Sequence, residues 1–135
     1  MIALDTSIVV RLLVNDNETQ ARVAYRLIAS HDVSVTLAVL METEWVLRTV
    51  YRFSKSRILD AMKGLSGLER MTFDDPVGAE TALRAFENGI DFSAAVHLAQ
   101  ARTARSFATF DKDVVKKAAK LTGLVPVFTP HVLER

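Results

Sequence analysis

Short apolar runs alternate with longer helix-forming segments along this chain, and this alternation restricts the fold more than any other feature. The runs are rich in β-branched or aromatic residues and are short enough to be strands, with the first one buried. They lie at 2–4, 33–36, 71–73, 106–110 and 125–128. Because helices separate these strands, the pattern predicts a three-layer α/β/α fold with a mainly parallel central sheet of four to five strands.

The segments between the strands carry helix formers and recognisable start signals. Ser54, Asp91 and Asp111 are suitable N-caps, and Pro76 suits the first turn of a helix. Helices are expected at 6–14, 17–30, 37–51, 55–66, 76–88, 91–104 and 111–121. No repeat or linker divides the sequence, so we expect one domain over residues 1–135.

Composition excludes several classes of protein. The chain has no cysteine, which removes disulfide scaffolds, thiol nucleophiles and Cys-ligated zinc. Lys and Arg number 17 against 16 Asp and Glu, a net charge of +1, which argues against an unselective binder of polyanions. No apolar run is long enough to span a bilayer and the N-terminus does not resemble a signal peptide, so we expect a cytoplasmic protein without a membrane partner.

Three aspartates stand where strands end or helices begin. Asp5 and Asp111 follow apolar strands, and Asp91 precedes a small-residue helix. Each could simply be a helix N-cap. In a parallel sheet, however, the carboxyl ends of strands share one edge, and carboxylates gathered there repel one another unless a cation compensates them. Oxygen ligands without cysteine favour Mg²⁺ or Mn²⁺, and this donor set indicates metal-assisted phosphodiester hydrolysis.

Four segments resemble, in order, the acidic blocks of PIN-domain ribonucleases. They are Met1–Arg11 (MIALDTSIVVR), Leu40–Arg48 (LMETEWVLR), Gly89–Ala99 (GIDFSAAVHLA) and Ala108–Asp113 (ATFDKD). Their order and spacing are similar to those of VapC toxins, and the resemblance covers essentially the whole chain. It implies a PIN-like fold.

The resemblance also implies roles for individual residues. Asp5, Glu42 and Asp111 match the metal-binding and catalytic acids of the family, and Asp91 belongs to its third acidic block. Residues matching or neighbouring supporting positions of the site are Ser7, Thr109 and Asp113.

Glu44 competes with Glu42 for the family's glutamate position. Two residues apart on a helix corresponds to a rotation of about 200°, so only one of the two can point into a given cleft. The apolar pattern of this helix does not choose between them, whereas the motif alignment selects Glu42.

Position 94 departs from the family pattern. Related sequences carry a second acid three residues after the position of Asp91, and this chain has Ala94 there. Three explanations stay open: Asp91 is the ligand and position 94 is accessory, the chain is a naturally weakened nuclease, or Ala94 is an engineered substitution.

The resemblance implies an Mg²⁺- or Mn²⁺-dependent endoribonuclease that cleaves RNA as the toxin of a VapBC-type pair. It also implies a homodimer, a VapB-type antitoxin partner, and DNA contact only through that antitoxin. One alternative is a PIN-like module that binds RNA or a partner without cutting it. A haloacid-dehalogenase-like phosphatase is a weaker alternative, because it needs a second aspartate where Ser7 stands.

Overall fold

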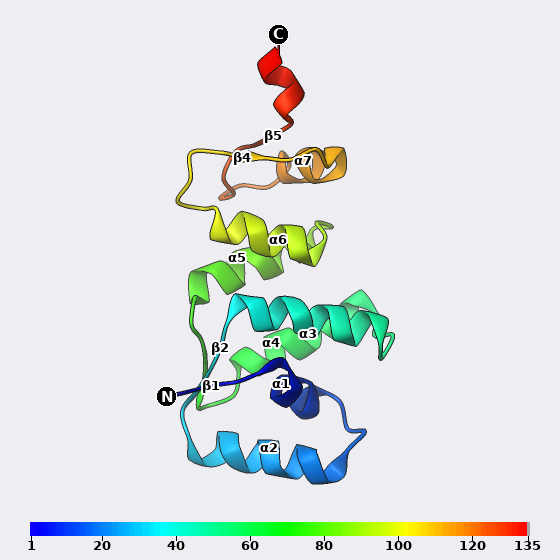
Figure 1. Ribbon diagram of the computed structural model, residues 1–135, viewed down its shortest axis with the longest axis vertical. Coiled ribbons are helices and arrows are strands. Elements are labelled where there is room, and N and C mark those ends of the chain that lie inside the picture. Colours follow the sequence, from blue (N-terminus) through cyan, green and yellow to red (C-terminus); the bar gives the residue numbers. More distant parts are fainter. Residues whose placement is uncertain (135) are drawn as a thin grey trace. The chain divides into compact units, whose positions relative to one another are not determined.

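The computed structural model describes residues 1–134, which form two compact units divided after Pro76. The elements of each unit are labelled in Figure 1. The first unit contains β1 (Ile2–Ala3), α1 (Thr6–Leu13), α2 (Glu18–Ser30), β2 (Val33–Val35), α3 (Leu37–Thr49), α4 (Lys55–Ser66) and β3 (Met71–Phe73). From Pro76 onward follow α5 (Pro76–Glu87), α6 (Phe92–Gln100), β4 (Phe107–Ala108), α7 (Lys112–Ala118), β5 (Val127–Phe128) and a 3₁₀ helix (Pro130–Glu134).

The first unit is built on a parallel sheet in the order β1-β2-β3. Val33 pairs with Ile2 on one side and with Met71 on the other. The central strand is the most buried of the three, with Val33 and Val35 fully inaccessible to solvent and Ser34 partly buried. In the view of Figure 1 the strands lie between α2 and α3. This arrangement explains why β2 is β-branched throughout its apolar positions.

Polar side chains begin the helices of this unit. Asn17, Thr36 and Ser54 each accept a hydrogen bond from a backbone amide in the first turn of the following helix. These bonds satisfy amides that have no partner inside the helix. The helix starts are therefore determined locally.

The second unit packs α5 and α6 around an aromatic pair. The rings of Phe86 and Phe92 meet edge to face with centroids 5.1 Å apart, a favourable arrangement of two aromatic rings. Ile90, Ala95 and Leu98 are buried in the same unit. The strands β4 and β5 pair in parallel.

The structure confirms the α/β class and the parallel pairing of the strands. The five strands, however, divide into a three-stranded and a two-stranded sheet, and β1 and β4 belong to different sheets. Two expectations about strands were wrong. The run 2–4 was expected to be a buried strand, but Ile2 and Ala3, which form β1 at the edge of the sheet, are exposed and only Leu4 is buried. The expected strands 106–110 and 125–128 are each reduced to two residues, because β4 and β5 pair with each other only over these positions.

Several helices end earlier than expected. The helix expected to reach residue 104 ends at Gln100, and the one expected to reach 121 ends at Ala118. Within the described residues, no helix has both the length and the apolar character needed to cross a membrane.

Candidate active site

Asp5 lies at the junction of β1 and α1, where its side chain is the N-cap of the helix. Its Oδ2 atom accepts hydrogen bonds from the Ser7 hydroxyl at 2.8 Å and from the Ser7 backbone amide at 3.3 Å. The Asp5 side chain is exposed, whereas Leu4 and Thr6 on either side are buried. The buried neighbours fix the backbone, and Ser7 fixes the orientation of the carboxylate.

These contacts also determine the charge of Asp5. The Ser7 hydroxyl, followed by the Ser7 amide, lowers the pKa of Asp5 below its ordinary value of 3.8, since hydrogen bonds to a carboxylate favour its ionised form. Asp5 is therefore a negatively charged oxygen donor at neutral pH. The supporting role expected for Ser7 rests here on a direct contact.

Asp91 repeats the arrangement of Asp5 in the second unit. Its Oδ2 accepts a hydrogen bond from the Ser93 hydroxyl at 2.6 Å and one from the Ala94 amide at 3.4 Å. Asp91 is thus both the N-cap of α6 and an exposed carboxylate. The cap interpretation is correct for Asp91, and it leaves Oδ1 without a hydrogen bond among residues 1–134.

Asp111 caps α7 through Oδ1, whereas Asp5 and Asp91 cap their helices through Oδ2. Its Oδ1 accepts hydrogen bonds from the amides of Asp113 at 3.0 Å and Val114 at 3.1 Å. Thr109 supports this turn by accepting the Asp111 amide at 3.0 Å. The Oδ2 atom of Asp111 has no hydrogen bond within the described chain, and the side chain is exposed. Such an oxygen is available to a ligand.

Lys117 connects the two acidic turns of the second unit. Its ammonium forms an ion pair with Asp113 at 2.8 Å and donates to the carbonyl of Gly89 at 2.9 Å. Gly89 has a φ of 102°, and a Cβ atom there would lie 3.6 Å from the Lys117 stem. The turn before Asp91 is therefore joined to the helix that Asp111 caps, and Asp113 stabilises the helix through Lys117.

The two glutamates of α3 have different environments. Glu44 is buried and receives the Arg48 guanidinium, with Nε 2.8 Å from Oε2. Glu42 is exposed. The structure therefore gives Glu44 an internal partner and leaves Glu42 accessible, and the role of Glu42 as a metal ligand stays a prediction.

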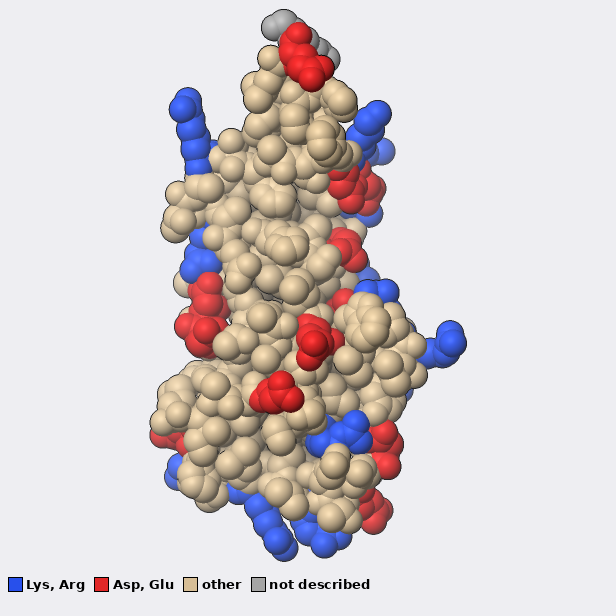
Figure 2. All heavy atoms as spheres, in the orientation of Figure 1, with Lys and Arg blue, Asp and Glu red and all other residues tan. Residues whose placement is uncertain are grey.

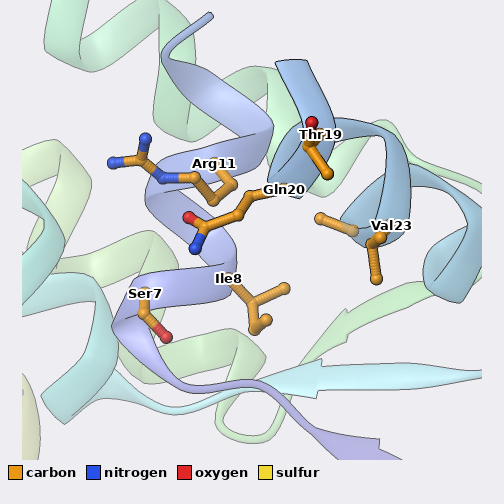
Figure 3. A pocket seen from close by; sticks show the side chains of 7 residues that line it. Ser7, Ile8, Arg11, Thr19, Gln20 and Val23 are labelled. Atoms are coloured by element: carbon orange, nitrogen blue, oxygen red, sulfur yellow. The ribbon is translucent and has the colours of Figure 1, made fainter. Parts of the chain in front are cut away.

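A groove lies beside Ser7, between α1 and α2. It has a volume of about 240 Å³ and is lined by Ser7, Ile8, Arg11, Thr19, Gln20, Val23 and Ala24. Figure 3 shows Gln20 reaching from α2 toward α1, with its amide between the Ser7 and Arg11 side chains.

Arg11 forms the cationic end of this groove, and residues after α1 and after α3 hold its side chain in place. Arg11 contacts the carboxylate of Asp16 and donates to the Tyr51 hydroxyl at 2.8 Å. The Tyr51 hydroxyl in turn donates to Asp16 at 2.7 Å. The Tyr51 contact raises the pKa of Arg11 and lowers the pKa of Asp16, so both stay charged.

The carboxylates have the donor chemistry that Mg²⁺ or Mn²⁺ requires. All four candidate acids are exposed, two in each unit: Asp5 and Glu42, then Asp91 and Asp111. Among residues 1–134, no group of three or more His, Asp or Glu side chains is placed to hold a metal ion. A shared metal centre made by the four acids stays a prediction.

The face of the molecule drawn in Figure 2 carries charged side chains of both signs. On this face, acidic and basic side chains are interspersed. This agrees with the net charge of +1. Binding to a polyanion would depend on local contacts more than on a wide basic surface.

Sequence reasoning missed two features of this region. Lys117 was not singled out, although its spacing of four residues from Asp113 is typical of a helical ion pair. The groove at Gln20 could not be found, because it depends on how α1 and α2 pack.

The family model described as "PIN domain" matches residues 2–121. Neither the search of curated proteins nor that of solved structures gave a match.

Proposed function

The chain belongs to the PIN-domain family, and on this basis we propose that it is a divalent-metal-dependent endoribonuclease. The family match carries the proposal, because residues 2–121 include all four candidate acids: Asp5, Glu42, Asp91 and Asp111. The fold is of a nuclease type, and it favours the PIN interpretation over the haloacid-dehalogenase-like phosphatase.

The acids of this chain would hold Mg²⁺ or Mn²⁺. A divalent cation in such a site lowers the pKa of water and stabilises negative charge on the reacting phosphodiester. Ser7 keeps Asp5 ionised and oriented through its 2.8 Å hydrogen bond. Asp91 and Asp111 each present one carboxylate oxygen that has no hydrogen bond within residues 1–134.

The finer assignment is to the VapC-type toxins. The order and spacing of the acidic segments resemble that branch, and they support a role as the RNA-cleaving toxin of a toxin–antitoxin pair. We propose a homodimer that acts in the cytoplasm and is inhibited by a VapB-type antitoxin. Any contact with DNA would be made through this antitoxin.

Ala94 supports a second candidate, a PIN-like module that binds RNA or a partner and cuts slowly or not at all. Ala94 is in the first turn of α6, and its backbone amide bonds to Asp91. The family's second acid would stand at this half-buried position. The chain then has fewer carboxylates than the family pattern provides.

Incubation of the purified chain with total RNA tests the proposal. Parallel reactions contain Mg²⁺, Mn²⁺ or EDTA, and an Asp5→Asn variant serves as the control. We expect cleavage that requires the metal and disappears in the variant. Equal cleavage by the variant would assign the activity to a contaminant and contradict the role of Asp5. Binding without cleavage would favour the second candidate.

A further inference from the structure

The groove between α1 and α2 touches the candidate active site through one side chain. Ser7 lines the groove and also donates its hydroxyl hydrogen bond to Asp5 at 2.8 Å. A group in the groove would therefore contact the residue that orients a candidate metal ligand. Ser7 alone connects the groove to Asp5.

The lining of the groove combines apolar surface with polar groups. Ile8 and Val23 supply aliphatic surface, and 61% of Val23 is exposed before anything binds. The Gln20 and Thr19 side chains have no hydrogen bond to another part of residues 1–134. A glutamine amide offers both a donor and an acceptor, so it can pair with a group that presents both on one edge.

The size of the groove limits its occupant. At about 240 Å³ it is smaller than the roughly 300–1,000 Å³ of pockets for drug-sized ligands. It suits one flat heterocycle better than a whole nucleotide chain. A nucleobase has an apolar face and a hydrogen-bonding edge, and proteins read unpaired RNA bases through these two features.

We propose that the α1–α2 groove binds one unpaired base of the RNA strand, next to the phosphodiester that is cut. The aliphatic side chains contact the face of the base, and the Gln20 amide reads its edge. Ser7 places this base beside Asp5. The inference rests on the proposed RNA substrate and adds to it the source of base selectivity.

Binding of single-stranded hexanucleotide RNAs tests the base site. The four RNAs place A, C, G or U at one position in an otherwise identical sequence, and binding is followed by the backbone and Gln amide NMR signals of the full chain. An Asp111→Asn background keeps an N-cap residue while removing a candidate ligand, so the RNA is expected to stay intact. In this background Gln20→Ala is compared with Gln100→Ala, the same change at another exposed helical glutamine.

We expect RNA to shift the signals of Gln20 and Val23 and to bind with a preference for one base. A bidentate amide contact predicts a preference of roughly tenfold. Gln20→Ala should remove this preference, and Gln100→Ala should keep it. Val23→Glu, at an exposed position, should weaken binding of all four RNAs without unfolding α2.

Two results would overturn the base site while leaving the proposed nuclease intact. One is a base preference that Gln20→Ala does not change. The other is RNA binding that shifts signals only outside the groove, which would assign the groove to another occupant such as a protein segment. If the parent chain neither binds nor cleaves RNA with Mg²⁺ or Mn²⁺, the proposed function fails, and this inference fails with it.

Discussion

Replacement of Lys117 by methionine tests how the acidic turns of the second unit are held. The change keeps the apolar stem and removes the charge, so the ion pair with Asp113 and the hydrogen bond to Gly89 are both lost. An exposed ion pair at this spacing contributes about 0.3–0.5 kcal/mol. A hydrogen bond from a charged donor contributes about 1.5–3 kcal/mol, and the lower end applies because the Lys117 side chain is 37% exposed. We expect the free energy of unfolding to fall by about 2 kcal/mol.

Urea denaturation followed by circular dichroism measures this loss. Asp113→Asn is the matched control, since it removes the ion pair and keeps the bond to Gly89, and it should cost only about 0.5 kcal/mol. Metal-dependent RNA cleavage should also fall in Lys117→Met and recover in part in Lys117→Arg. Equal, small losses in Lys117→Met and Asp113→Asn would refute the bridging role of Lys117.

Four other substitutions test the candidate acids and the residues beside them. Ala94→Asp should raise Mg²⁺-dependent RNA cleavage, and an acid in the first turn of α6 should not destabilise the helix; unchanged cleavage would show that no gap exists there. Ser7→Ala should return the Asp5 pKa toward 3.8, measured by NMR titration of the carboxyl carbon. Because the folded pKa of Asp5 is lowered, its stabilising effect is present above the unfolded pKa and is lost as pH falls through the folded pKa. Glu42→Gln should abolish cleavage without loss of stability, whereas Glu44→Gln should cost about 1 kcal/mol in urea denaturation; the reverse pattern would make Glu44 the ligand.

The helix starts were predictable from the sequence because they depend on local chemistry. Ser54 and Asp111 are the N-caps that the sequence indicated. The ends of the strands were less predictable. β4 and β5 pair over only two residues each, and strand length depends on pairing with a distant segment.

The candidate site shows the same division between local and tertiary information. The resemblance implied a site acid at Asp5 and a supporting residue at Ser7, and the hydrogen bond between them is local because the two residues are close in the chain. The motif alignment selects Glu42, and this selection stays a prediction. The burial of Glu44 beside Arg48 depends on the packing of α3 and could not be read from the apolar pattern of the helix. The α1–α2 groove requires two packed helices, and no pattern within either helix indicates it.

Three of the candidate acids, Asp5, Asp91 and Asp111, are also helix N-caps, and this double use affects how a harmless form of the protein can arise. Alanine at these positions removes the charge and the cap together, so it destabilises the start of the helix. Asparagine removes the charge and remains a good cap. A single base change converts an aspartate codon to an asparagine codon, so a chain that has lost its chemistry and kept its fold is one mutation away at each of these positions.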